Sequence, residues 1–164
     1  MYRERKHIRL RNFDYSSENL HFITICTNNR ECFFGEILDK KMILSPIGNI
    51  ANLFWTEIPN HFPHVVLDGY IIMPNHVHGI IRIGSRHGMT LFNNKQKKFN
   101  KFGKPVPGSV SVIINHYKSA VKRWCNKNGH EKFGWQPRFY DNIINNQKDL
   151  ERIRNYIISN PERI

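Results

Sequence analysis

Two apolar, β-branched runs follow one another in the middle of the chain, and they restrict its possible folds more than any other feature. The runs cover residues 65–73 and 77–83 and are separated by Pro74-Asn75. β-Branched residues favour strands, and a Pro-Asn step favours a turn. We therefore expect two antiparallel strands joined by a tight connection.

The flanking segments extend this pair into a complete pattern. Residues 21–27 and 138–144 have the composition of strands. Three helices are expected: one that begins at Ser45-Pro46 and ends at Pro59, one capped by Ser109, and one that begins at Asn146 and ends at Pro161. The order β-α-β-β-α-β plus a C-terminal helix predicts an α+β fold of the ferredoxin-like, split βαβ kind, with an antiparallel sheet and two helices on one face. We expect a single domain over residues 1–164.

The positive charge of the chain is concentrated in one stretch. Between Gly69 and His130 there is no Asp or Glu but eleven Lys and Arg, whereas the rest of the chain has fourteen basic and thirteen acidic residues. A field of one sign favours a polyanion, although a merely solubilising surface is the alternative. Residues 84–108 have no apolar periodicity and are expected to form a flexible basic loop. The expected DNA-binding residues are Arg82, Lys95, Lys97, Lys98, Lys101, Lys104, Lys118, Lys122, Arg123 and Arg138.

Composition also excludes some classes of protein. No run approaches the roughly 18 apolar residues of a transmembrane helix, so we expect no membrane association and a cytoplasmic location. Cys26, Cys32 and Cys125 form an odd number without a CxxC pair, which argues against a disulfide framework and a structural zinc site.

His76 and His78 stand at the start of the second of the two apolar strands, with Val77 between them. Alternate residues of a strand point to the same face, so both imidazoles are expected to project together. Two adjacent imidazoles are a metal-binding geometry. The alternative is that one of them is only a polar residue near a strand end.

The last helix carries two further candidates, Tyr156 and Asn160. They are four residues apart and border the apolar stripe of Leu150, Ile153 and Ile157, so both are expected to face the edge of the sheet. A carboxamide oxygen suits a hard cation and a phenol can attack phosphorus. On spacing alone, packing in the core or at its boundary is the more common role of such a tyrosine.

Several motifs, in order along nearly the whole chain, resemble the REP-associated tyrosine transposases, a branch of the single-tyrosine HUH transposase superfamily. They are IRLRNFDYS, FITICTNNR, CFFGEI, MPNHVHGII, WQPRFYDNII and NYIISNP. The resemblance implies that His76 and His78 are the HUH pair and Tyr156 the nucleophile. It also implies that Asn160, which is Gln in some relatives, completes the metal site. Tyr117 is the rival nucleophile, but its place in an apolar stripe favours burial.

The resemblance further implies a reaction and a substrate. We expect a metal-dependent endonuclease and strand transferase that uses Mg²⁺ or Mn²⁺ and forms a 5′-phosphotyrosine intermediate. The substrate would be single-stranded or hairpin DNA from palindromic repeats, and the enzyme a monomer or a homodimer.

One other interpretation remains open, and two more are disfavoured by the sequence. A basic DNA-binding protein without catalysis would have the same charge pattern. A nucleotide hydrolase or transferase with alternating histidines would need a third His where Ile80 stands. A transposase with three carboxylates would need acidic ligands, which residues 69–130 do not contain.

Overall fold

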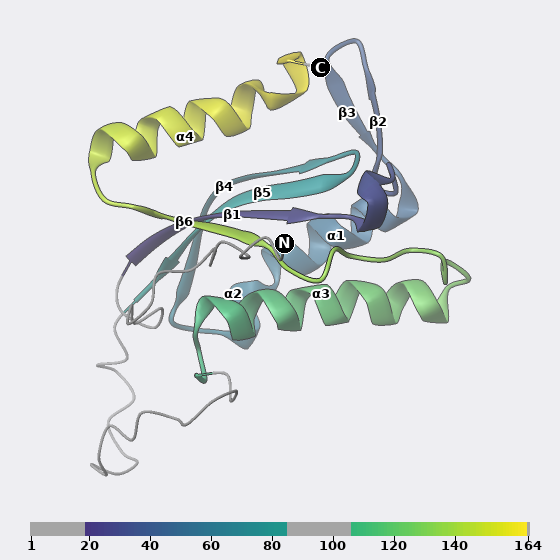
Figure 1. The fold of residues 1–164 in the computed structure, drawn as a ribbon, viewed down its shortest axis with the longest axis horizontal. Coiled ribbons are helices and arrows are strands. Elements are labelled where there is room, and N and C mark those ends of the chain that lie inside the picture. The colour runs from purple at the N-terminus through teal and green to yellow at the C-terminus, as the bar shows by residue number, and fades with distance from the viewer. Residues whose placement is uncertain (1–18, 85–105, 164) are drawn as a thin grey trace, which may run out of the picture.

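The computed structural model describes residues 19–84 and 106–163. A four-stranded antiparallel sheet in the order β4-β5-β1-β6 forms the centre of the fold (Figure 1). Its strands are β1 (Asn19–Cys26), β4 (Val65–Met73), β5 (His76–Ile83) and β6 (Tyr140–Ile144). The helices are α1 (Pro46–Thr56), α2 (Ile58–His61), α3 (Val110–Lys127) and α4 (Gln147–Ser159). Two 3-10 turns follow β1 and α4, namely η1 (Asn28–Arg30) and η2 (Asn160–Arg163). This is the expected α+β arrangement.

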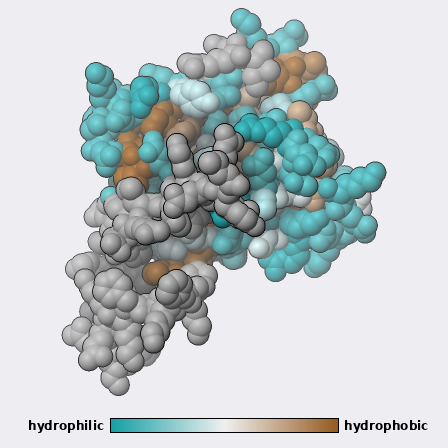
Figure 2. All heavy atoms as spheres, viewed as in Figure 1, coloured by the Kyte–Doolittle hydropathy of each residue, from teal (hydrophilic) through white to brown (hydrophobic). Residues whose placement is uncertain are grey.

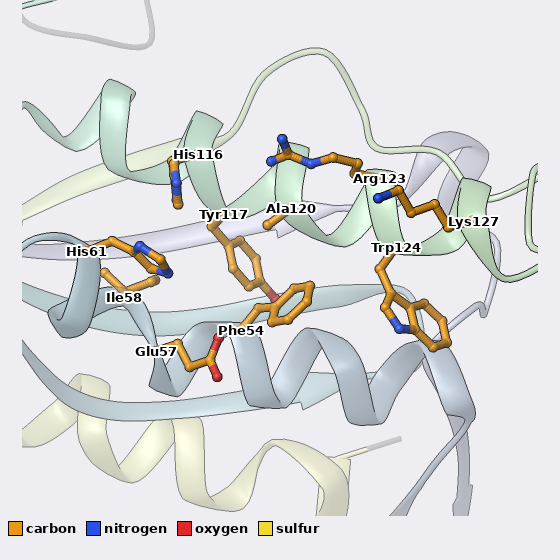
Figure 3. A pocket seen from close by; sticks show the side chains of 10 residues that line it. All are labelled: Phe54, Glu57, Ile58, His61, His116, Tyr117, Ala120, Arg123, Trp124 and Lys127. Atoms are coloured by element: carbon orange, nitrogen blue, oxygen red, sulfur yellow. The ribbon is translucent and has the colours of Figure 1, made fainter.

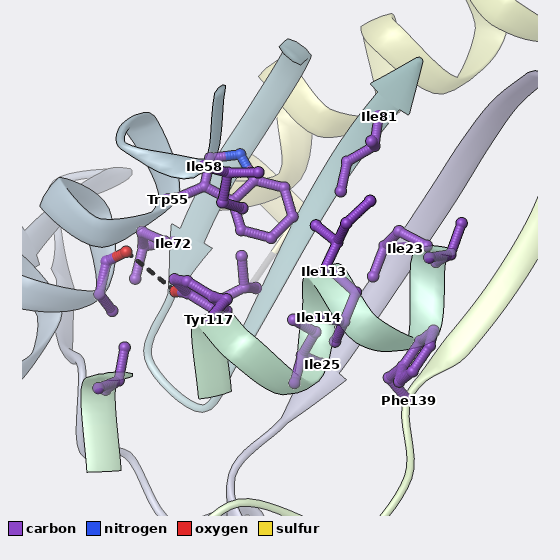
Figure 4. Close-up of a cluster of buried hydrophobic side chains, with 14 of the residues drawn as sticks. Ile23, Ile25, Trp55, Ile58, Ile72, Ile81, Ile113, Ile114, Tyr117 and Phe139 are labelled. Atoms are coloured by element: carbon purple, nitrogen blue, oxygen red, sulfur yellow. Dashed lines mark hydrogen bonds between the residues drawn. The ribbon is translucent and has the colours of Figure 1, made fainter. Parts of the chain in front are cut away.

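The helices cover the two faces of the sheet unequally. Helices α1, α2 and α3 lie on one face and α4 lies on the other (Figure 1). The larger core fills the space between the sheet and α1 and α3, with Trp55, Tyr117 and Ile113 among its fully buried side chains (Figure 4). A second, smaller cluster fills the space under α4 and consists of Ile80, Ile144, Leu150, Ile153 and Ile157.

The local sequence explains where two of the helices begin. The Ser45 side chain accepts a hydrogen bond from the Gly48 N–H at 3.0 Å, and the Asn146 side chain accepts one from the Asp149 N–H at 2.8 Å. Both side chains satisfy amides that have no partner within the helix. Helix α3 also begins after the expected residue, but the Ser109 side chain makes no capping hydrogen bond.

Two elements were absent from the prediction. The first helix ends at Thr56, and a separate short helix, α2, contains Pro59, where that first helix was expected to end. A separate hairpin of β2 (Gly35–Leu38) and β3 (Lys41–Leu44) stands between β1 and α1. Its two turn residues, Asp39 and Lys40, both have positive φ angles, of 48° and 61°. Such hairpin turns usually contain Asn or Gly, so this sequence lacks the common turn signal.

The expected flexible loop and its lysines fall almost entirely on residues 85–105, outside the described residues. None of the helices in the described part has the length and apolar character needed to cross a membrane. On the face shown in Figure 2, the described residues form small hydrophobic patches between larger hydrophilic areas.

Candidate active site

His76 and His78 lie side by side at the start of β5, on the face of the sheet that α4 covers. Their ring centroids are 4.5 Å apart. Val77 points to the opposite face, where it joins the larger core. His78 is only 6% exposed and His76 is half-buried. The alternation expected from the sequence therefore brings the two imidazoles together.

Hydrogen bonds to the Nδ1 atoms orient both rings. His76 Nδ1 lies 2.7 Å from the side-chain oxygen of Asn75, whose amide nitrogen donates to the Arg30 carbonyl. Because a carboxamide oxygen only accepts, Nδ1 of His76 carries the hydrogen and Nε2 presents a lone pair. His78 Nδ1 lies 2.8 Å from the Thr24 hydroxyl on the neighbouring strand. Partners on the far ring nitrogen are typical of metal-binding histidines.

Burial keeps both rings neutral. Loss of solvation lowers the pKa of His76 to about 4, with a further contribution from the positive charge of Arg30. Loss of solvation, together with the neighbouring His76, lowers the pKa of His78 to about 3. Both rings are therefore uncharged at neutral pH, which is the form that binds a cation.

Tyr156 approaches this pair from α4. Its hydroxyl oxygen lies 3.5 Å from Nε2 of His78, and the two ring centroids are 5.4 Å apart. Phe22 on β1 supports both rings: it stacks on His78 at 5.3 Å and meets the edge of Tyr156 at 6.3 Å. The expectation that Tyr156 faces the edge of the sheet was wrong, because β5 is an interior strand.

Asn160 lies one helical turn after Tyr156, where α4 passes into η2, and is 6% exposed. Within the described ranges, no three His, Cys, Asp or Glu residues come close enough together to hold a metal ion. A cation at His76 and His78 would therefore depend on an oxygen donor such as the Asn160 carboxamide. Two neutral imidazoles and an amide oxygen are ligands that Mn²⁺ accepts readily and Mg²⁺ less so.

Tyr117, the rival nucleophile, lies on the opposite side of the sheet. It is buried in the larger core between α1 and α3, and its hydroxyl donates to the Ala51 carbonyl at 2.9 Å (Figure 4). Burial raises the pKa of this phenol well above its ordinary value. Tyr117 therefore has neither the position nor the ionisation of a nucleophile.

Two of the basic residues predicted to bind DNA make structural contacts on α3. Lys118 is only 9% exposed, and its amine donates to the Gln136 carbonyl at 2.7 Å. The amine of Lys122 donates to the Glu131 and Phe133 carbonyls. Both lysines thus fasten the segment after α3 to the helix.

The other predicted basic residues are more accessible or lie outside the described residues. Arg82 is exposed on β5, on the same face as His78 by strand alternation, while Arg123 and Arg138 are exposed elsewhere. Lys95, Lys97, Lys98, Lys101 and Lys104 lie outside the described residues. Exposure of a basic side chain does not by itself test DNA binding, so these assignments stay predictions.

A hollow of about 350 Å³ lies between α1, α2 and α3 (Figure 3). Phe54, Trp124, His61, His116 and Arg123 are among its lining residues. It lies on the face of the sheet opposite His76, His78 and Tyr156, and it shares no residue with that site. The hollow is therefore separate from the candidate active site.

Sequence reasoning missed the residues that support the site. Thr24 and Phe22 come from β1, and only the pairing of Thr24 with His78 across the sheet shows that they are neighbours of the histidines. Asn75 was assigned only to the turn, although its position next to His76 was a usable signal.

Comparison with known proteins places the chain in a family. It is 37% identical over 158 residues to an uncharacterized protein of Haemophilus influenzae, a match that covers 96% of this chain and 88% of that protein. The chain belongs to the family of that protein. No family model matches the sequence.

Two solved structures have the same fold as this chain. One is a REP-associated tyrosine transposase bound to a REP hairpin, with a TM-score of 0.60 and 17% identity, and it covers 99% of this chain and 74% of the other. The second is a proposed transposase from Deinococcus radiodurans, with a TM-score of 0.51, 13% identity and 96% of each chain covered. At these identities the likeness establishes a common fold.

Proposed function

We propose that this chain is a metal-dependent DNA endonuclease and strand transferase that acts through Tyr156. The observation that carries the proposal is the approach of the Tyr156 hydroxyl to within 3.5 Å of His78 Nε2, next to His76. Two elements far apart in the sequence bring a nucleophile and two neutral imidazoles to one point. The fold shared with a REP-associated tyrosine transposase supports the same assignment.

In the proposed reaction, the phenol oxygen of Tyr156 attacks a DNA phosphorus atom. The bond from phosphorus to the 3′ oxygen breaks, the phenol loses its proton, and the leaving fragment gains one as a 3′-hydroxyl. The product is a 5′-phosphotyrosine bond, which another 3′-hydroxyl can attack to join strands. The backbone of one chain brings Tyr156 and His78 together, so the geometry does not require a tyrosine from a partner.

The proposed metal ligands are His76, His78 and Asn160. Bound there, Mg²⁺ or Mn²⁺ would polarise a non-bridging phosphate oxygen and offset the charge that develops on it. The chain itself fixes the two rings through Asn75 and Thr24 and keeps them unprotonated through burial. We extend the substrate class, single-stranded or hairpin DNA, from the transposase that was solved with a REP hairpin.

Covalent capture tests this proposal. The protein is incubated with hairpin oligonucleotides that carry a label at the 3′ end, the end that stays with the protein, and single-stranded flanks of randomised sequence. The reactions contain MnCl₂ or EDTA and are run on a denaturing gel. We expect a labelled protein band with the metal and none with EDTA. The band should be lost in Tyr156→Phe and kept in Tyr117→Phe, a matched change at the buried phenol.

Two outcomes would contradict the proposal. A covalent band formed by Tyr156→Phe would show that another residue is the nucleophile. Retarded DNA migration on a native gel, without any covalent band on the denaturing gel in the wild type, would favour the alternative of a basic DNA-binding protein without catalysis.

A further inference from the structure

Helix α4, which carries Tyr156, is attached to the sheet through the smaller of the two apolar clusters. Its buried residues Leu150, Ile153 and Ile157 belong to the smaller cluster with Ile80 and Ile144. The larger core lies on the other side of the sheet. Apolar contacts are not directional, so a small cluster of this kind leaves the rotation of the helix about its axis weakly determined.

An irregularity in β4 supplies a directional contact. Leu67 pairs with Ile81 and Tyr70 pairs with Gly79, so Asp68 and Gly69 both oppose Ile80. This is the arrangement of a β-bulge, which redirects side chains next to it. Ile80 contributes to the cluster under α4, and the bulge presents Asp68 on that same side.

The Asp68 carboxylate binds the Arg154 guanidinium through two hydrogen bonds. Nε of Arg154 donates to one carboxylate oxygen at 2.8 Å and a terminal nitrogen donates to the other at 2.5 Å. The Gly69 N–H donates to the first oxygen at 2.7 Å and holds the acid in place. A two-point contact of this kind fixes orientation as well as distance.

Arg154 and Tyr156 lie on opposite flanks of the apolar stripe of α4. Two residues correspond to about 200° around a helix, so one flank meets β4 through Arg154 while the other brings Tyr156 over His78. A side-chain atom about 6 Å from the helix axis moves roughly 1 Å for each 10° of rotation. A misplacement of about 1 Å can slow a reaction about 100-fold.

We propose that Asp68 and Arg154 are positioning residues that set the rotation of α4 and thereby place the Tyr156 hydroxyl beside His78. The inference rests on the proposed function for its consequence in catalysis, but the positioning itself can be measured without activity. Neither residue touches the two histidines through any contact that the structure shows, so both act through the helix.

The kinetic test compares Arg154→Gln and Asp68→Asn with Arg152→Gln. Arg152 is the matched control because it lies on the same helix in an exposed pair with Asp149. We expect both test variants to slow single-turnover formation of the covalent adduct about 10- to 100-fold. DNA affinity in Arg154→Gln should equal that of Arg152→Gln, since both lose one positive charge.

The opposite charge changes separate positioning from electrostatics. Arg154→Gln removes a positive charge and Asp68→Asn removes a negative one, so an effect of net charge would move their rates in opposite directions. Loss of positioning would instead slow adduct formation in both variants. The exchanged pair Asp68→Arg with Arg154→Asp should recover part of the lost rate, and adduct rates equal to that of Arg152→Gln in both single variants would overturn the proposal.

An NMR measurement tests the positioning even if no adduct forms. The rings of His78 and Tyr156, whose centroids are 5.4 Å apart, are close enough for a nuclear Overhauser effect between their protons. The effect should weaken in Asp68→Asn and Arg154→Gln and persist in Arg152→Gln, with the folded state of each variant checked by its methyl spectrum. An unchanged effect in both test variants refutes the positioning role, whereas a wild type without adduct refutes only the proposed function.

Discussion

Gly79, between His78 and Ile80, is expected to be one of the positions least tolerant of a methyl group. A Cβ at this position would lie 2.1 Å from Cζ2 of Trp55, whereas ordinary contacts begin at 3.4 Å. Trp55 is fully buried and cannot retreat easily, because its ring meets the Tyr117 ring edge-on at 5.2 Å. The strand or the ring must therefore shift by roughly 1 Å in a closely packed core.

We expect Gly79→Ala to lower the free energy of unfolding by about 3 kcal/mol, at the upper end of the usual overpacking cost. For a chain of this length, that corresponds to a fall in Tm of roughly 6–12 °C. Thermal unfolding followed by circular dichroism measures it.

Gly69→Ala is the matched control for this substitution. Gly69 lies on the adjacent strand β4, and a Cβ there would only reach Arg154 Cγ and Ile157 Cδ1 at 4.0 Å. Its Tm should stay close to that of the wild type, because the added methyl group meets ordinary contacts and the change stiffens the unfolded chain. Equal melting temperatures for the two variants would refute the packing of Trp55 on β5 as described.

Two further predictions concern the histidine site and the thiols. Thr24→Val removes the hydroxyl beside His78 Nδ1 but keeps the shape of the side chain, so formation of the covalent adduct should slow about 10- to 100-fold and require more Mn²⁺. Thr24→Ser keeps a hydroxyl and should retain the wild-type rate. An unchanged Mn²⁺ titration in Thr24→Val would contradict the orienting role of Thr24. Cys125 and Cys26 are buried and Cys32 is exposed. Burial raises the pKa of Cys125 to about 11 and raises that of Cys26, so a thiol reagent at neutral pH should titrate one thiol in the native protein and three in denaturant. A second fast-reacting thiol in the native protein would show that one of these sites opens.

The sequence predicted the elements whose signals are local. Strand β4 has the bounds expected from its apolar run, and α1 and α4 begin after the expected caps Ser45 and Asn146. The hairpin β2–β3 was missed because Asp39 and Lys40 adopt positive φ angles without a glycine. A turn of this kind is recognised from its conformation and not from its composition.

Some features of the candidate site follow from local sequence patterns, and others depend on contacts between distant segments. The alternation of His76 and His78 and the helical spacing of Tyr156 and Asn160 are periodic patterns, and they could be predicted. The contact of Thr24 with His78 depends on the register between β1 and β5, which no local pattern fixes. The contact of Asp68 with Arg154 joins β4 to α4, elements far apart in the sequence, and no local pattern fixes it.

The sheet separates the molecule into two regions that can vary independently. Substitutions in the larger core alter how firmly the chain folds, whereas those beneath α4 alter how the tyrosine meets the histidines, and strand β5 contributes side chains to both. Changes on one side could therefore remove the proposed catalytic chemistry and leave a well-folded, basic protein.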